Sequence, residues 1–292
     1  MRQFDYLRVS TLREAFDAVW DSKGSSVFMA GGTDLLVKIK QGTIQPRRVI
    51  DMKGIRETEG FSITESEFSV GSLTTIRALE TSPAAREKVP LLAQAAARLG
   101  SVQVRNRATI GGNLCNAAPS AETAPALLAL EARAEIYGRK GLRVVDLRDF
   151  FLGAGLTSLE EGEILASLKI PLNGARTGAV YYKVTTRKAM DIAFAGVAVL
   201  LEIDEDDRIE KARIALGAVA PTPVRAPSAE RVLEGRTLDA GLIHESAELA
   251  GQACRPITDL RASAGYRREM VIQLCRQGLA VAYHQAKSLT AS

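Results

Sequence analysis

The spacing of apolar and polar residues predicts a chain that uses both helices and strands. Residues 11–14, Thr-Leu-Arg-Glu, fit a capping box, and the apolar positions within residues 12–19 recur at helical spacing. Beyond this short helix, the pattern predicts a strand at Ser26–Met29, a helix at Asp34–Lys40 and a second strand at Arg48–Met52. The chain therefore begins as an α/β unit.

The middle of the chain changes to a pattern typical of antiparallel strands. Residues 61–64 and 68–71 alternate on either side of the polar Glu65-Ser66-Glu67, which predicts a hairpin. Helices are predicted at 90–99 and 123–130. Further strands are predicted at 133–137, 142–145 and 164–170, the last of which stops at Pro171.

A polar, glycine-rich segment at Asn173–Gly178 predicts a domain boundary. Strands are predicted next at 179–184, 192–203 and 208–219, and an acidic turn at 204–207 joins the last two. From Ser228 onward the pattern is helical, with Gly235 as a helix C-cap and a long amphipathic helix at 265–287. We therefore expect a second domain of strands followed by helices.

Composition excludes several classes of protein. With 46% hydrophobic residues among 292, the chain can bury a sizeable core, so disorder is not its main state. The net charge of +4 is spread along the chain, and no basic run interleaved with aromatic residues predicts a nucleic-acid partner. The longest apolar run, Ile192–Leu201, is far short of the roughly 20 residues of a membrane helix. The N-terminal sequence lacks an apolar signal region, so we expect a cytoplasmic protein.

Two glycine pairs mark the candidate binding site. They lie in the loops Met29–Leu35, MAGGTDL, and Ala108–Leu114, ATIGGNL. Glycine has no Cβ and adopts positive φ, so consecutive amides can converge on an anion, and Thr33, Thr109 and Asn113 add short donors. Either loop alone fits a simple turn as well as a phosphate-binding loop, but together they predict a site that binds both phosphates of a dinucleotide. Neither loop matches G-x-G-x-x-G or the Walker lysine motif, which argues against a Rossmann site and an NTPase.

Four stretches in order make the sequence resemble a known family. They are AGGTDL at 30–35, TIGGN at 109–113, EILASLKIP at 163–171 and GAVAPTPVRA at 217–226. Along essentially its whole length the chain resembles the FAD-binding medium subunit of molybdenum hydroxylases, the xanthine dehydrogenase and carbon monoxide dehydrogenase family. The resemblance implies an α+β fold of the vanillyl-alcohol-oxidase (PCMH) type.

The same resemblance implies a division of the chain into domains. An FAD-binding domain would span residues 1–175, with subdomains at about 1–57 and 58–175. A C-terminal domain of antiparallel strands and helices, of the carbon monoxide dehydrogenase flavoprotein type, would span 176–292.

The resemblance also implies which residues bind FAD. Glu122 matches a family acid that contacts the cofactor, Leu165 matches a position whose backbone meets the flavin ring, and Lys183 matches a lysine near the isoalloxazine that favours the anionic reduced flavin. Ile192 is a further candidate. The full set of cofactor-binding residues implied is Met29, Ala30, Gly31, Gly32, Thr33, Asp34, Leu35, Leu36, Leu99, Thr109, Ile110, Gly111, Gly112, Asn113, Glu122, Leu165 and Lys183.

Simpler interpretations of three of these residues stay open. Glu122 also fits a first-turn acid that favours the helix dipole, Leu165 a residue of the strand core, and Lys183 a surface lysine. Cys115 fits a small buried hydrophobe better than a redox group, and His244 and His284 fit surface or packing positions.

In the family, a small 2Fe-2S subunit relays electrons from a large molybdenum-cofactor subunit to FAD. The resemblance therefore implies an oxidoreductase subunit that passes electrons to an acceptor such as NAD+, with the flavin as the reactive group and no catalytic side chain. Three scattered cysteines cannot supply four ligands, so we expect no iron-sulfur cluster and no metal in this chain. Two alternatives stay open, a self-contained flavin reductase of the same fold and a noncatalytic nucleotide-binding assembly module.

Overall fold

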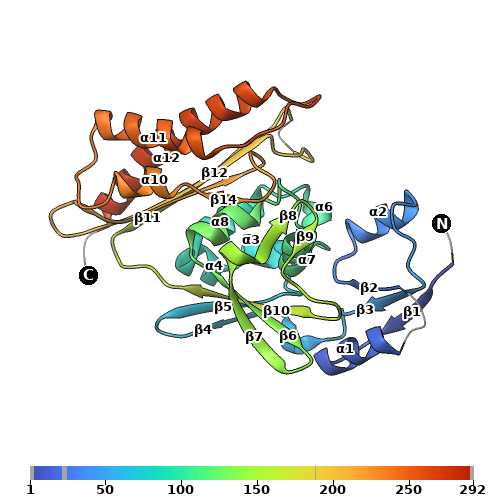
Figure 1. Cartoon of the computed structure of the whole chain (residues 1–292). Helices are drawn as coiled ribbons and strands as arrows, with labels where there is room; N and C mark the ends of the chain where they lie inside the picture. Colours follow the sequence, from blue (N-terminus) through green and yellow to red (C-terminus); the bar gives the residue numbers. More distant parts are fainter. Residues whose placement is uncertain (1–2, 22–24, 188, 290–292) are drawn as a thin grey trace.

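The computed structural model describes residues 3–21, 25–187 and 189–289, which form an α+β structure (Figure 1). Its first part is a parallel three-stranded sheet in the order β1-β3-β2. One helix follows each of the first two strands. These elements are β1 Asp5–Arg8, α1 Leu12–Trp20, β2 Ser26–Met29, α2 Leu35–Lys40 and β3 Arg48–Asp51.

The start of α1 follows the capping-box pattern with one difference. Thr11 Oγ1 accepts a hydrogen bond from the Glu14 amide at 3.1 Å. The Glu14 carboxylate accepts from the Ser10 amide at 2.7 Å, one residue before the amide that a standard box would use. The first bond satisfies an amide that the helix itself leaves without a partner, and the second holds the residue before the cap.

The second part is a five-stranded antiparallel sheet in the order β4-β5-β10-β6-β7, with short helices on one face. The strands are β4 Phe61–Ile63, β5 Glu67–Gly71, β6 Arg133–Gly138, β7 Gly141–Asp146 and β10 Ile164–Pro171. The helices are α3 Ile76–Thr81, α4 Pro83–Lys88, α5 Pro90–Ala97, α6 Val102–Arg105, α7 Ile110–Cys115, α8 Thr123–Ala129 and α9 Leu147–Phe150. Smaller elements are the 3-10 helix at Arg56–Thr58 and the strands β8 Phe151–Gly153 and β9 Leu156–Thr157.

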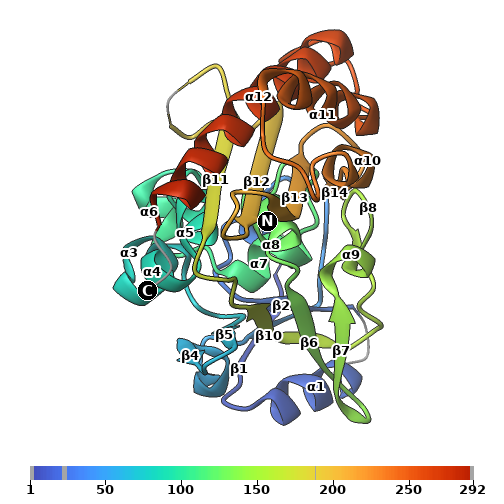
Figure 2. The ribbon, with the colours of Figure 1, turned by 90° about the vertical axis from the view of Figure 1, so that its left-hand side faces the viewer.

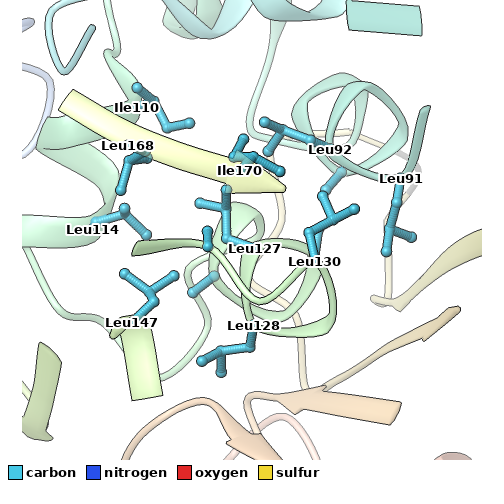
Figure 3. Packing of buried hydrophobic residues seen from close by; sticks show 14 of the residues in the cluster. Leu91, Leu92, Ile110, Leu114, Leu127, Leu128, Leu130, Leu147, Leu168 and Ile170 are labelled. Atoms are coloured by element: carbon cyan, nitrogen blue, oxygen red, sulfur yellow. The ribbon is translucent and has the colours of Figure 1, made fainter. Parts of the chain in front are cut away.

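The central strand β10 divides the core of this part into two sides. Leu168 and Ile170 face the helices, where Figure 3 shows Leu168 beside Leu114 of α7 and Ile170 beside Leu127 of α8. Ile164 belongs instead to the core that β3 and α1 form on the other side. A β-bulge between Leu165 and Ser167 shifts the alternation by one residue, so Leu165 faces the helical side together with Leu168.

The third part is a four-stranded antiparallel sheet in the order β11-β12-β13-β14. α12 crosses one face of this sheet and α8 lies under the other, as Figures 1 and 2 show together. Its elements are β11 Thr177–Val184, β12 Ala195–Ile203, β13 Ile209–Gly217, β14 Val224–Arg225, α10 Pro227–Arg231, α11 Ala240–Ala253 and α12 Ala264–Ser288.

Because helices cover both faces, β12 is apolar at successive positions rather than at alternate ones. Val197, Val199 and Leu201 face α12, whereas Ala198 and Leu200 belong to the core shared with α5 and α8. The C-terminal part therefore packs directly on the helices of the second part. The predicted boundary at Asn173–Gly178 covers most of the connection between β10 and β11 and the first two residues of β11, and the division at residue 175 stays a prediction. The outermost residues of the predicted domains, 1–2 and 290–292, lie outside the described residues.

Most predicted elements are present with shifted ends, and several short ones were missed. The predicted strand at 192–203 starts only at Ala195, because the preceding residues form a loop. The predicted helix at 90–99 ends at Ala97. The missed elements include β1, α3, α4, α6 and α7, each of them six residues or shorter. In the described part of the chain, none of the helices combines the length and the apolar character needed to cross a bilayer.

Candidate functional site

A cavity of about 650 Å³ lies where the three parts of the chain meet. Its walls come from the loop between β2 and α2, from α7, from β10 and from residues 190–192 of the third part. This volume is within the range of about 300–1,000 Å³ that is usual for cofactor pockets. Both predicted glycine pairs are in the wall, so the structure brings the two distant loops together.

The first glycine loop presents free amides. Among the described residues, no protein acceptor takes a hydrogen bond from the five amides of Gly31 to Leu35. Gly32 has φ of +77°, a conformation that glycine adopts without strain. Gly31 packs against the Arg107 backbone, so the first loop touches the residues that lead into α7. Free amides in a concave wall fit an anion such as the diphosphate of FAD.

The second glycine loop corrects our sequence interpretation, because its amides are already used. Thr109 is the N-cap of α7, and the helix begins inside the TIGGN motif. Four amides in a row donate to protein acceptors at 2.8–3.1 Å: Ile110 to Thr74 O, Gly111 to Ser72 O, Gly112 to Thr109 Oγ1 and Asn113 to Thr109 O. The prediction of bare amides in this loop is therefore wrong.

What α7 offers the cavity is side-chain donors. Thr109 Oγ1 accepts from Gly112, which leaves the hydroxyl hydrogen for another partner. Asn113 Oδ1 accepts from the Thr123 hydroxyl at 2.6 Å, and this bond orients the Asn113 side chain with its Nδ2 group unused by the described residues. The two loops thus supply different kinds of donor to one wall.

A buried ion pair joins Glu122 to Lys183. The Lys183 Nζ lies 2.7 Å from Glu122 Oε1, and the two side chains are only 7% and 11% exposed. Lys183 also donates to the Arg98 carbonyl at 3.0 Å and to the Asp191 carbonyl at 2.9 Å. Burial raises the pKa of Glu122, and the Lys183 ammonium opposes that rise.

This pair adds to the earlier interpretations of its members. Glu122 is the N-cap residue of α8, where an acid also favours the helix dipole, but its side chain makes no capping hydrogen bond and pairs with Lys183 instead. The buried side chain of Lys183 excludes a surface lysine. Glu122 lines the cavity, and its neighbour Lys183 fixes it there.

Most of the predicted site residues line the cavity. They are Ala30, Gly31, Gly32, Thr33, Asp34, Leu35, Leu99, Thr109, Gly111, Gly112, Asn113, Glu122 and Leu165, together with the further candidate Ile192. The other predicted residues are neighbours of the wall: Met29 ends β2, Ile110 is fully buried, Leu36 is exposed on α2, and Lys183 contacts Glu122. Direct contact of any of these residues with FAD stays a prediction.

Sequence reasoning missed several lining residues, notably Lys38, Ser72, Asn116 and Met190. Lys38 had a usable signal, because it lies one turn after Asp34 on the predicted helix. Met190 had none, because its place depends on a loop that folds back so that its amide donates to the Gly100 carbonyl.

Cys115 lines the cavity, and burial raises the pKa of its thiol to about 12. The neutral thiol is consistent with the interpretation as a small apolar residue. His244 and His284 are both exposed, on α11 and α12. In the described part of the chain, no three His, Cys, Asp or Glu side chains form a group able to hold a metal ion.

Comparison with known proteins decides the family. Residues 2–173 match the family model described as the FAD binding domain in molybdopterin dehydrogenase. The chain belongs to this family. Residues 180–282 of this family member match a second model, the carbon monoxide dehydrogenase flavoprotein C-terminal domain.

Curated relatives and solved structures of the family extend over nearly the whole chain. The carbon monoxide dehydrogenase medium chain of Hydrogenophaga pseudoflava is 33% identical over 281 residues, 96% of this chain and 97% of that one. The xanthine dehydrogenase FAD-binding subunit of Escherichia coli O157:H7 is 32% identical over 268 residues, 91% of each chain.

Two structures share the fold. A chain of the Hydrogenophaga pseudoflava carbon monoxide dehydrogenase structure superposes with a TM-score of 0.94 at 33% identity, covering 97% of this chain and 98% of that one. A chain of quinoline 2-oxidoreductase from Pseudomonas putida 86 gives 0.92 at 29% identity and covers 98% of both. These matches confirm the predicted α+β PCMH-type fold, the FAD cofactor and the assignment as the flavoprotein component of an oxidoreductase.

Proposed function

We propose that this chain relays electrons within a heteromeric molybdenum hydroxylase. It would take them from a small 2Fe-2S subunit, which is supplied by a large molybdenum-cofactor subunit, and pass them to an acceptor such as NAD+. Bound FAD supplies the redox chemistry, because a flavin exchanges electrons either singly or in pairs. The chain itself supplies binding and orientation.

The observation that carries this proposal is the row of free amides from Gly31 to Leu35 inside a cavity of about 650 Å³. We place the FAD diphosphate at these amides, with the Thr109 hydroxyl and the Asn113 amide as side-chain donors from the opposite loop. Donors fixed by the fold lose little freedom when the anion binds, so they favour tight retention of the cofactor.

The apolar part of the cavity suits the flavin ring. Leu99 and Leu165 are buried side chains that also line the wall, and Ile192 lines it from the third part of the chain. The Glu122 and Lys183 pair lies at the same wall with its charges mutually compensated, so its proposed role is to hold this wall in place rather than to present a bare cation. This replaces the expectation that Lys183 alone stabilises the anionic reduced flavin.

The names of relatives support a multisubunit assembly. Relatives are described as medium chains of carbon monoxide dehydrogenase and glyceraldehyde dehydrogenase and as subunit alpha of a 6-hydroxypseudooxynicotine dehydrogenase complex. For this chain, we propose the same division of labour, with substrate oxidation on another polypeptide and a location in the cytoplasm.

The test begins with the isolated chain and then adds partners. The purified chain should show flavin absorbance bands and about one FAD per chain, whereas a colourless protein that cannot be reconstituted contradicts the proposal. Co-expression with neighbouring small and large subunits should give a stable complex that reduces NAD+ with substrate. If the chain is isolated only as a monomer although both partners are present, the proposed electron relay is contradicted. Turnover of substrate and NADPH by this chain alone supports a self-contained reductase instead.

A further inference from the structure

Lys38 is the single cation among the described residues that line the cavity. The charged lining residues are Asp34, Lys38, Glu122, Glu163 and Asp191. Three of the acids already have cationic partners: Glu122 pairs with Lys183 at 2.7 Å, Glu163 with Arg143 at 2.6 Å and Asp191 with Arg187 at 3.5 Å. Asp34 and Lys38 are left as the charges without an ion pair to the described residues.

The contacts of Lys38 hold its ammonium without neutralising it. Its Nζ donates to Asn116 Oδ1 at 2.6 Å, across 78 positions of sequence. Lys38 is on α2 and Asn116 directly follows α7, so this bond joins the two elements that carry the glycine loops. Because Asn116 is uncharged and an ammonium has three donors, a full positive charge and two donors remain available.

The position of Lys38 relates it to the free amides of the first loop. The Lys38 amide donates to the Asp34 carbonyl at 3.0 Å. The Lys38 side chain therefore starts one helical turn after Asp34, which belongs to the loop with the free amides. An anion held by these amides would also meet the Asp34 carboxylate nearby, which repels it. A cation on the next turn offsets that repulsion.

From this geometry we infer that Lys38 binds the diphosphate of the dinucleotide, and that Asn116 orients its ammonium for this contact. The inference rests on the proposed placement of FAD in the cavity. The amides of the first loop are neutral donors, so Lys38 is the side chain that adds charge recognition. Lys38 is thereby a residue that selects dinucleotides over ligands that lack phosphate.

The experiment compares three ligands: FAD, ADP and riboflavin. ADP has the diphosphate without the flavin, and riboflavin has the flavin without phosphate. With the apo form of the full chain, Lys38→Met should weaken FAD and ADP by roughly 10- to 100-fold, the range expected for a charge-assisted hydrogen bond. Riboflavin affinity should not change. Raising the salt concentration should weaken FAD binding to the wild type more than to Lys38→Met.

Matched variants separate charge from fold. Lys40→Met alters an exposed lysine on the same helix that is outside the cavity wall, so it should leave the affinities unchanged. Lys38→Arg should restore much of the binding of FAD and ADP. Asn116→Ala keeps the cation but removes its orienting partner, so it should cause a smaller loss with the same ligand pattern. If Lys38→Met does not fold, Asn116→Asp provides the test, because a carboxylate beside Lys38 neutralises it and should weaken FAD and ADP alone.

Two results would overturn the inference. Equal losses from Lys38→Met and Asn116→Ala for all three ligands, riboflavin included, would mean that the bond only fastens the two loops together. Unchanged affinity of Lys38→Met for FAD would exclude the contact. Either result leaves FAD binding by the wild type intact, whereas a wild type that fails to bind FAD contradicts the proposed function itself.

Discussion

The carbonyl oxygen of Arg107 occupies the space that a side chain at Gly31 would need. A Cβ built at Gly31 lies 2.0 Å from this oxygen and 2.9 Å from the Ala108 Cα. Both atoms belong to backbone that leads into α7, so no side-chain rotation relieves the contact. The glycine at this position therefore allows the two halves of the cavity wall to meet.

Gly31→Ala should separate these two segments. We expect a loss of about 1–3 kcal/mol in the free energy of unfolding, because the extra methyl group forces backbone to move. The FAD content of the purified protein should fall with it. Gly265→Ala in α12 is the control, since nothing lies within 4 Å of its Cβ, and it should be neutral or slightly stabilising. Thermal unfolding and the ratio of flavin to protein absorbance measure both effects, and a Gly31→Ala protein with full FAD content would show that the contact does not shape the site.

Substitutions of increasing size at Gly112 test the space between α7 and the first glycine loop. A Cβ at Gly112 would lie 3.0 Å from Thr109 Oγ1 and 3.9 Å from the Ala30 Cβ, so alanine requires only a small shift of the Thr109 side chain. Valine at this position adds two methyl groups between α7 and the first loop, where we place the diphosphate. Gly112→Val should therefore purify with little FAD while remaining folded, and Gly112→Ala should keep most of it. Circular dichroism checks the fold, and equal FAD content in the two variants contradicts this placement.

The sequence predicted that the two glycine loops lie at one binding site. Glycine pairs flanked by small polar residues indicate a loop whose amides can approach an anion, because glycine has no Cβ and adopts positive φ. It could not predict which acceptors take hydrogen bonds from the amides of the second loop. In TIGGN, the threonine caps a helix that begins at the next residue, and the acceptors for Ile110 and Gly111 are carbonyls of Thr74 and Ser72. Those carbonyls come from a turn far away in the sequence, so no local pattern reveals them.

The same limit applies to the charges. Glu122 and Lys183 are separated by 61 positions and become partners only when β11 packs beside the start of α8. A buried charge is stable only with such a partner, but the sequence does not say which acid meets which base. The long elements were easier to predict, since β12 is apolar at nearly every position and the apolar residues that α12 buries recur at helical spacing.

Removal of Lys183 should leave Glu122 buried without its counter-charge. Lys183→Met should lower the free energy of unfolding by about 3–5 kcal/mol near neutral pH, the cost of breaking a buried ion pair. The loss should depend on pH, because burial then raises the pKa of Glu122 without opposition. A carboxyl group whose pKa is raised by folding stabilises the fold below its unfolded value of 4.5 and loses that contribution as the pH rises.

Urea unfolding of Lys183→Met should therefore show decreasing stability from about pH 4.5 upward. The double variant Glu122→Gln/Lys183→Met is the control, because a neutral amide replaces the carboxylate. It should recover part of the lost stability at pH 8 and show no matching slope. A Lys183→Met protein whose stability relative to the double variant is the same at pH 5 and pH 8 would mean that Glu122 finds another partner.

Cys115 provides a direct report on what fills the cavity. Its thiol lines the wall, and burial raises its pKa to about 12, so the reactive thiolate is scarce at neutral pH. In the apo form, alkylation by a maleimide should be slow and should accelerate about tenfold for each pH unit between 7 and 9. FAD should suppress the reaction, because it covers the thiol. Cys254 and Cys275 are fully buried and should remain unmodified by mass spectrometry, and Cys115→Ser should abolish labelling. If Cys115 reacts at the same rate with and without saturating FAD, the cofactor lies elsewhere than in this cavity.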